Sequence, residues 1–169
     1  MKITLRNPDY VSERLQQSTF RILESVELCS IATVGSDGEG HINAAYFCYT
    51  DGLDIYFVSD PSTTHCKNIE RSPRVAIAVF DTHLPWGEPI RGLQLFGHCH
   101  LATTVESAHA LATHAARFHA YGDYIKALSP FEKESSPYRF YVFQALTLKV
   151  VDEPEFGEET FITAEVVRS

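Results

Sequence analysis

Side chains that could bind an anionic group are concentrated in one short stretch, FVSDPSTTHCKNIERSP, between residues 57 and 73. Asp60 and Pro61 favour a helix start there, because aspartate accepts bonds from the first free amides and proline has no N–H to leave unused. The helix is expected to end near Ser72, since Pro73 disfavours helical geometry in the residue before it. The electropositive end of this short helix would then carry hydroxyls, an imidazole and an amine, from Ser62, Thr63, Thr64, His65 and Lys67. Free amides beside such groups suit a phosphate.

The same stretch also allows simpler interpretations. Ser62 or Thr63 could do no more than cap the helix, because hydroxyl caps are very common. Cys66 lies close enough to the helix start for its thiol pKa to be lowered, but it falls past the first turn, which favours an ordinary thiol.

The composition is that of an acidic globular protein. The chain has 169 residues, is 44% hydrophobic and carries a net charge of −8 without a basic run, so one domain with a sizeable core is expected and a nucleic-acid groove is not. No apolar stretch reaches the roughly 20 residues that span a bilayer, and MKITLRNPDY lacks the apolar core of a signal peptide. A cytoplasmic location is therefore expected.

Cysteine and histidine are present but not in patterns typical of metal sites. The spacing of Cys29, Cys48, Cys66 and Cys99 fits neither a CxxC metal site nor a dense disulfide framework, so buried free thiols are expected. The eight histidines are scattered along the chain. Most of them are expected to be surface or packed side chains.

The hydrophobic pattern predicts a protein made mainly of β-strands, with helices at three places. The predicted order is a helix over about 8–26, strands over 28–35, 41–50 and 53–59, the short helix, strands over 74–80 and 92–101, a helix from the capping box at 103–106 to about 121, an irregular or partly helical segment over 124–137, and strands over 139–151 and 159–167. Sequential hairpins without regular β–α–β alternation argue against a parallel sheet. A closed or split β-barrel with flanking helices, in one domain over residues 1–169, fits better.

This pattern resembles the FMN-binding split-barrel superfamily typified by pyridoxamine 5′-phosphate oxidase. The resemblance covers about residues 25–105 and depends on the order of SIATVGSDGEGHINAAYF, LDIYFVSDPSTTHCKNIERSPRVAIAVF and IRGLQLFGHCHLA, while the tail beyond residue 137 matches loosely. Within the superfamily, the chain is more similar to a small uncharacterised bacterial branch than to the oxidase itself. The resemblance implies a mainly β (α+β) fold with a six-stranded antiparallel split barrel. It also implies a homodimer with FMN at the subunit interface.

The resemblance assigns cofactor-binding positions residue by residue. Asn43 falls where an arginine normally reaches the phosphate, and Ala44, Ala45 and Tyr46 would run beside the isoalloxazine. Backbone groups of Val58 and Ser59 would contact the polar edge of the ring. Thr63 falls at the phosphate-binding hydroxyl, Thr64 at its usually basic neighbour and His65 at the usual lysine. Gly92 falls where the oxidase has a glutamine that reaches the flavin from the partner chain, and Gln94 lies two residues on along the same strand face.

The departures from the oxidase pattern affect both affinity and activity. Asn43, Thr64 and His65 remove most of the fixed positive charge, although Lys67 could restore one charge from another direction on the helix. Because charge-assisted hydrogen bonds are about twice as strong as neutral ones, FMN should bind less tightly than in the oxidase. The C-terminal substrate-binding tryptophan and arginines of the oxidase are absent, so oxidation of pyridoxamine phosphate is not expected.

The favoured hypothesis is an FMN-dependent oxidoreductase or reductase that acts on an unidentified small molecule over the region of Tyr46 and Trp86. Such chemistry needs few side chains because the flavin carries it. Trp86 could equally do no more than cover the core. One alternative is a haem-binding or haem-degrading protein, since the superfamily includes such members and the chain has eight histidines, of which His98 and His100 share a strand face. Another is a flavin-binding dimer without turnover. The sequence does not decide between FMN, deazaflavin and haem.

Overall fold

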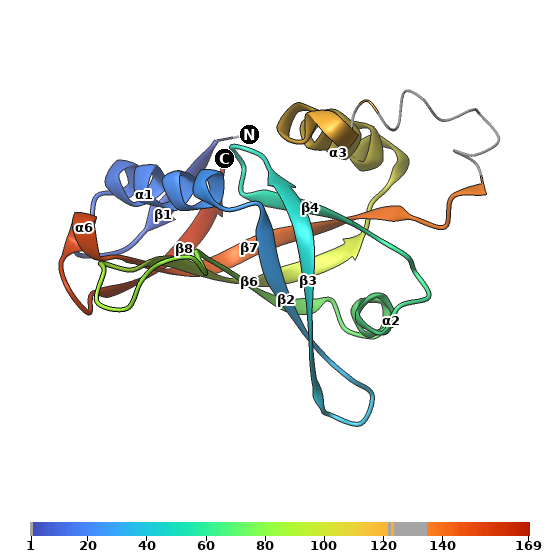
Figure 1. The fold of residues 1–169 in the computed structure, drawn as a ribbon, viewed down its shortest axis with the longest axis horizontal. Coiled ribbons are helices and arrows are strands. Elements are labelled where there is room, and N and C mark those ends of the chain that lie inside the picture. Colours follow the sequence, from blue (N-terminus) through green and yellow to red (C-terminus); the bar gives the residue numbers. More distant parts are fainter. Residues whose placement is uncertain (1, 122, 124–134) are drawn as a thin grey trace.

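The fold is an antiparallel β-barrel flanked by helices (Figure 1). The computed structural model describes residues 2–121, 123 and 135–169. The described strands are β1 (Ile3–Arg6), β2 (Leu28–Val34), β3 (Gly40–Tyr49), β4 (Asp54–Ser59), β5 (Arg74–Phe80), β6 (Arg91–Leu101), β7 (Arg139–Asp152) and β8 (Phe161–Arg168), and the helices are α1 (Ser12–Ser25), α2 (Thr64–Arg71), α3 (Thr104–Arg117) and α6 (Glu153–Phe156).

Six of these strands close the barrel. Their order is β7-β4-β3-β2-β5-β6, and β6 returns to pair with β7. The long strand β7 makes this possible, because one edge pairs with β6 while the other pairs first with β4 and then with β8. β1 extends the sheet beyond β8. The predicted six-stranded antiparallel barrel with flanking helices is thus confirmed.

The barrel interior is filled by alternate side chains of its strands. Phe47, Phe57, Phe143, Ile31 and Leu95 are all completely buried. Successive strand residues point to opposite faces of a sheet, so one set of alternating positions supplies a contiguous apolar core. The four cysteines are buried and free, as predicted.

The boundaries of some elements differ from the predictions. The short helix begins at Thr64, because Asp60 is used in a turn in which its Oδ1 accepts from the Ser62 N–H at 2.8 Å. It ends at Arg71, one residue before the predicted stop. The first helix begins only at Ser12, because Asn7 is used in a turn in which its Oδ1 accepts from the N–H groups of Asp9 and Tyr10 at 2.8 and 3.1 Å. Residues 3–6 form a strand that the sequence pattern did not predict. The capping box of Thr103 and Glu106 is confirmed at the start of α3, which ends at Arg117. After a break at Phe118, helical backbone resumes over 119–121, where the predicted helix ends. Most of the predicted irregular segment, residues 124–134, lies outside the described residues.

The barrel is split between β3 and β4. β3 pairs with β2 along Gly40–Tyr46, but it pairs with β4 only through Phe47–Tyr49. In the described part of the chain, no strand covers the remaining edge of β3. Helix α2 packs against β2 and β3 beside this edge, where the Asn68 amide donates to the Thr33 hydroxyl at 3.1 Å.

The opposite side of β3 belongs to an exposed apolar face of the sheet. Ile42 and Tyr46 on β3 are 71% and 57% exposed, and Leu28, Phe80 and Phe96 on neighbouring strands are also exposed. In the strand register, small side chains lie between these large ones on neighbouring strands, namely Ala32, Ala44, Ala76 and Ala78. We call this surface the apolar face. None of the described helices is long and apolar enough to cross a membrane.

Candidate functional site

Three side chains meet in a corner where β4 ends and α2 begins. The Ser59 hydroxyl lies 2.7 Å from His65 Nε2, and the Thr63 hydroxyl lies 3.3 Å from the same nitrogen. Thr63 also donates to the Asp60 carbonyl at 2.7 Å, which holds the approach to the helix in a tight turn. Ser59 and His65 are buried, so packing fixes the positions of these side chains. We call it the α2 corner.

The helix start adds backbone donors to the α2 corner. The Lys67 N–H already bonds to the Thr63 carbonyl at 3.1 Å. Among the described residues, no acceptor meets the N–H groups of Thr64, His65 and Cys66, as is usual in the first turn of a helix. These dipoles favour an anion. The Thr64 and Lys67 side chains are exposed, and neither joins the Ser59–Thr63–His65 cluster.

Strand β3 supplies the facing wall. His41, Asn43 and Ala45 are half-buried on the side toward α2, and the His41 ring stacks on the His65 ring with centroids 6.1 Å apart. The Asn43 Oδ1 atom is buried and has no hydrogen-bond partner among the described residues. An orphaned acceptor of this kind is costly unless something else satisfies it. Asn43 therefore provides an acceptor suited to a hydroxyl or N–H group of a ligand.

Cys66 lies against the same cluster. Burial raises the pKa of its thiol, but hydrogen bonds with the side chains of His65, Ser59, Thr63 and Tyr141 outweigh burial and lower the pKa to about 7. The other cysteines behave in the opposite way, since burial raises the pKa of Cys29 and of Cys48 to about 12. The α2 corner is thus an environment that stabilises negative charge.

The remaining positions predicted for the cofactor lie on the apolar face or near it. Ala44 and Tyr46 point away from α2 into a hollow of about 380 Å³, which Leu28 and Phe80 also line. Gln94 lies in the next row of the same face, beside a hollow of about 360 Å³. Val58 is half-buried near the end of β4. Because alternate side chains of a strand point to opposite faces, Ala44 and Tyr46 lie on the other side of β3 from Asn43.

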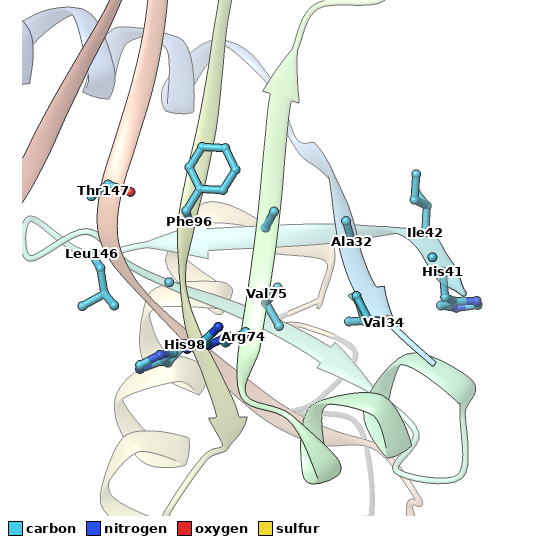
Figure 2. A pocket seen from close by; sticks show the side chains of 14 residues that line it. Ala32, Val34, His41, Ile42, Arg74, Val75, Phe96, His98, Leu146 and Thr147 are labelled. Carbon is cyan, nitrogen blue, oxygen red and sulfur yellow. The ribbon is translucent and has the colours of Figure 1, made fainter. Parts of the chain in front are cut away.

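A larger groove of about 790 Å³ lies at the other end of the apolar face. Figure 2 shows Phe96 and Leu146 on its walls and the side chains of Arg74 and His98 close together. Arg74 and His98 are directly opposite each other on β5 and β6. In the described part of the chain, the Arg74 guanidinium forms no ion pair. The groove therefore combines apolar walls with an uncompensated positive charge.

Other histidines have local partners. His100 Nε2 lies 3.0 Å from the Glu106 carboxylate. His114 is buried against the rings of Phe118 and Tyr121. The described residues contain no group of three or more histidine, cysteine or acidic side chains that could hold a metal ion.

Comparisons with known proteins identify the family of this fold. A family profile described as pyridoxamine 5′-phosphate oxidase matches residues 15–152. The chain belongs to the pyridoxamine 5′-phosphate oxidase family. No curated protein matches it.

Solved structures similar to this family member share its fold at low sequence identity. The haem binding protein from Mycobacterium smegmatis has a TM-score of 0.71 at 17% identity over 89% of this chain, which spans only 57% of that longer protein. A protein from Clostridium acetobutylicum, related to general stress protein 26 of B. subtilis and described as of the pyridoxinephosphate oxidase family, has a TM-score of 0.62 at 14% identity, with 92% and 96% of the two chains covered. HutZ, the haem storage protein from Vibrio cholerae, has a TM-score of 0.63 at 14% identity, with 89% and 95% covered.

Two features of this region could not be predicted from the sequence. His41 was not considered, because nothing in its local sequence shows that it stacks on a histidine 24 positions later. The 790 Å³ groove could not be predicted either, because it is built from five strands, β2, β3, β5, β6 and β7, and a bulge at Gly97. Of these, only the Gly97 position gave a signal, since a glycine inside a strand often marks a bulge.

Proposed function

We propose that the protein is a homodimeric FMN-binding oxidoreductase or reductase that acts on a small organic molecule. The observation that carries this proposal is the α2 corner, where Ser59, Thr63 and His65 meet the open N-terminus of α2 beside the unpaired edge of β3. Family membership supports it, because flavin is a common ligand of this fold family.

The groups at the α2 corner could bind a phosphate, although all of the donors are neutral. Three backbone N–H groups, the Ser59 and Thr63 hydroxyls and the His65 imidazole converge at the corner, and none of the described arginines or lysines joins them. To donate to a phosphate, the Thr63 hydroxyl would turn away from the Asp60 carbonyl, which accepts its hydrogen bond here. A phosphate there would be held by hydrogen bonds and by the helix dipole. The orphaned Asn43 Oδ1 suits a hydroxyl of the ribityl chain, which would relieve the cost of its burial.

Bound flavin would supply the hydride chemistry, and the chain's own residues would bind and orient the reactants. The unpaired β3 edge offers backbone donors and acceptors to the polar rim of a flat ring. The hollow lined by Ala44, Tyr46, Leu28 and Phe80 has space and apolar walls for a small organic acceptor. Tyr46 would place its ring over that acceptor and keep water away.

The proposed dimer would cover the apolar face. Large side chains such as Ile42 and Tyr46 are more than half exposed there, and a broad exposed apolar patch commonly marks a protein–protein interface. The small residues in the middle of the face would allow two sheets to approach closely. A partner would also shield the hollow beside Tyr46 from solvent.

A titration with two ligands tests the cofactor proposal. FMN and riboflavin differ only in the phosphate, so the α2 corner should bind FMN more tightly, measured by quenching of flavin fluorescence. Thr63→Val should weaken FMN binding by about two- to tenfold, the worth of one ordinary hydrogen bond, and leave riboflavin binding unchanged.

Thr104→Val is the matched control for this titration, because Thr104 is an exposed hydroxyl at the start of α3. It should alter neither affinity. A colourless purified protein that quenches neither ligand would overturn the proposal.

A haem-binding role is the second candidate. His98 beside the apolar 790 Å³ groove favours it, since a flat apolar macrocycle needs such walls and a nitrogen ligand. Two of the similar structures are described as haem proteins. A Soret band on addition of haemin that His98→Ala abolishes would support this role, and its absence in the wild-type protein would exclude it.

A further inference from the structure

The loop between β5 and β6 is exposed to solvent along its whole length. All ten of its residues, Asp81 to Ile90, are exposed, and Trp86, the single tryptophan of the protein, is fully exposed. Its base is fixed, because the Ile90 N–H donates to the Glu153 carboxylate at 2.9 Å and the Ile90 carbonyl accepts from the Glu153 N–H at 3.1 Å. We call residues 81–90 the Trp86 arm.

The composition of the Trp86 arm is unusual for a solvent-exposed loop. Leu84, Pro85, Trp86, Pro89 and Ile90 are apolar, and Trp86 lacks the intramolecular contacts that a large ring normally gains. A tryptophan is highly buried on average and is enriched where proteins contact each other. Covering it would remove a large apolar area from water.

We propose that the Trp86 arm of one copy docks into the 790 Å³ groove of a second copy. This inference rests on the proposed homodimer and names the residue that each partner contributes to the other. The groove has apolar walls from Phe96, Leu146 and Ile42, and its volume exceeds what one indole ring needs. Neighbouring apolar arm residues can therefore enter with the ring.

Charge complementarity supports the same pairing. Arg74 and His98 lie at the groove, and the Arg74 guanidinium forms no ion pair within the described residues. Glu88 lies two residues after Trp86 and is likewise without an ion pair in the described part of the chain. An arm seated in the groove would bring Glu88 toward Arg74, and the two unpaired charges would satisfy each other.

The register of the sheet shows how two copies can make this contact twice. The arm follows Phe80, at one end of the apolar face, and the groove lies around Ala76 and Arg74, four to six residues away along the same strand. At about 3.3 Å per residue the two ends are roughly 13–20 Å apart. Between them lies a row of small side chains, Ala44, Ser30 and Ala78. A two-fold axis across the strands at that row exchanges the two ends, so each arm reaches the other groove in a closed dimer.

The single tryptophan makes the test direct, because all tryptophan fluorescence comes from Trp86. The dimer is measured by sedimentation equilibrium, and acrylamide quenching is measured over the same concentrations. Docking predicts that the emission maximum moves to shorter wavelength and quenching falls as dimer forms. Trp86→Ala should raise the dimer dissociation constant about tenfold or more, as expected for loss of a central aromatic anchor. The exposed Lys2→Glu is the control and should leave it unchanged.

A charge exchange supplies the second test. Arg74→Glu and Glu88→Lys should each weaken the dimer, and the double variant should recover most of the loss. A dimer in which Trp86 is quenched as freely as in the monomer would overturn the docking and leave the homodimer standing. A protein that is monomeric at all concentrations would overturn both, while flavin titration of the same samples reports on the cofactor separately. Haemin bound in the groove of a dimer with Trp86 exposed would also overturn the docking.

Discussion

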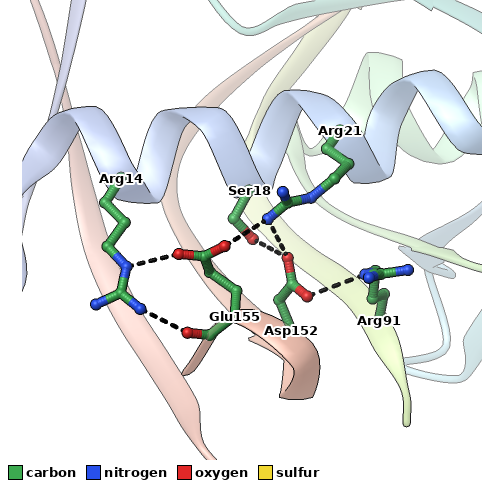
Figure 3. Close-up of polar contacts among 6 residues, drawn as sticks. All are labelled: Arg14, Ser18, Arg21, Arg91, Asp152 and Glu155. Carbon is green, nitrogen blue, oxygen red and sulfur yellow. Dashed lines mark hydrogen bonds and ion pairs between the residues drawn. The ribbon is translucent and has the colours of Figure 1, made fainter. Parts of the chain in front are cut away.

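Replacing Asp152 with asparagine should destabilise the protein more than any comparable surface change. The Asp152 side chain is completely buried, and its carboxylate accepts from Ser18 at 2.7 Å, from Arg21 at 2.8 Å and from Arg91 at 3.0 Å (Figure 3). These bonds join α1 and β6 to the end of β7. Arg91 also lies at the base of the Trp86 arm.

The expected loss of stability of Asp152→Asn follows from the burial and charge of this carboxylate. Breaking a buried ion pair by neutralising one partner costs about 3–5 kcal/mol. Arg21 and Arg91 are each 46% exposed and can regain some water, so we expect a lower value, about 2–4 kcal/mol. In a chain of this length that loss lowers the melting temperature by about 5–15 °C.

Glu155→Gln is the matched control. Glu155 also pairs with Arg21 and with Arg14, but its side chain is 28% exposed. Because water reaches this carboxylate, we expect a clearly smaller loss of stability than for Asp152→Asn. Urea unfolding at neutral pH compares the two variants. Equal losses, or a loss below about 1 kcal/mol for Asp152→Asn, would refute the assignment of stability to the buried carboxylate.

The pH dependence gives an independent check. Burial raises the pKa of Asp152, but the hydrogen bonds from Ser18, Arg21 and Arg91 outweigh it, so the folded pKa lies below the ordinary value. A lowered pKa stabilises the fold above the unfolded value near 3.9, and this contribution is lost as pH falls through the folded pKa. The difference in unfolding free energy between wild type and Asp152→Asn should therefore shrink in strong acid.

Three further predictions concern other parts of the fold. Burial, followed by the charge of Arg117, lowers the pKa of His114 to about 4. On acidification this histidine is therefore protonated in the unfolded chain before it is protonated in the folded protein, and the free energy of unfolding should fall by about 2 kcal/mol between pH 7.5 and pH 5. Urea unfolding of His114→Leu should lack this pH dependence, and an unchanged pH dependence would contradict the assignment. A Cβ at Gly97 would lie 2.0 Å from the Gln144 carbonyl oxygen, whereas one at Gly92 would meet nothing closer than 3.5 Å. Gly97→Ala should therefore cost at least about 2 kcal/mol of stability, and Gly92→Ala under about 1 kcal/mol. Equal melting temperatures of the two variants would argue against this. FMN affinity should change little between low and high salt, because none of the described arginines or lysines joins the α2 corner. A steep decrease with salt would indicate a charged group there.

Strands and helices with regular patterns could be predicted from the sequence. The capping box at Thr103 and Glu106 and the apolar alternation of the barrel strands are local signals, and they gave the correct element types. The predicted start of α2 was wrong because Asp60 can serve either as a helix cap or in a turn. The bonds from Ser62 to the Asp60 carboxylate and from Thr63 to the Asp60 carbonyl hold the turn. The strand Ile3–Arg6 was missed because its partner, β8, lies at the other end of the chain.

The candidate site also combines features that local sequence predicts with features that depend on tertiary packing. Ser59, Thr63 and His65 lie within seven residues of one another, so a strand-to-helix pattern was enough to bring them together. The stacking of His41 on His65 and the orphaned Asn43 amide depend on how α2 settles against β3. Sequence reasoning also grouped Thr64 and Lys67 with the corner. Their exposed side chains show that closeness along a helix does not fix a shared direction.

The proposed phosphate site at the α2 corner has only neutral donors among the described residues, so other parts of a flavin would have to contribute more of its binding free energy. Neutral hydrogen bonds contribute about half as much as charge-assisted ones, so the ring and ribityl chain would carry a larger share of the binding free energy. The groups available to them are the unpaired edge of β3, the Asn43 amide and the hollow beside Tyr46. The last of these lies on the apolar face, which the proposed partner would cover. Cofactor retention should therefore depend on the dimer more strongly than in a family member whose corner carries arginine and lysine.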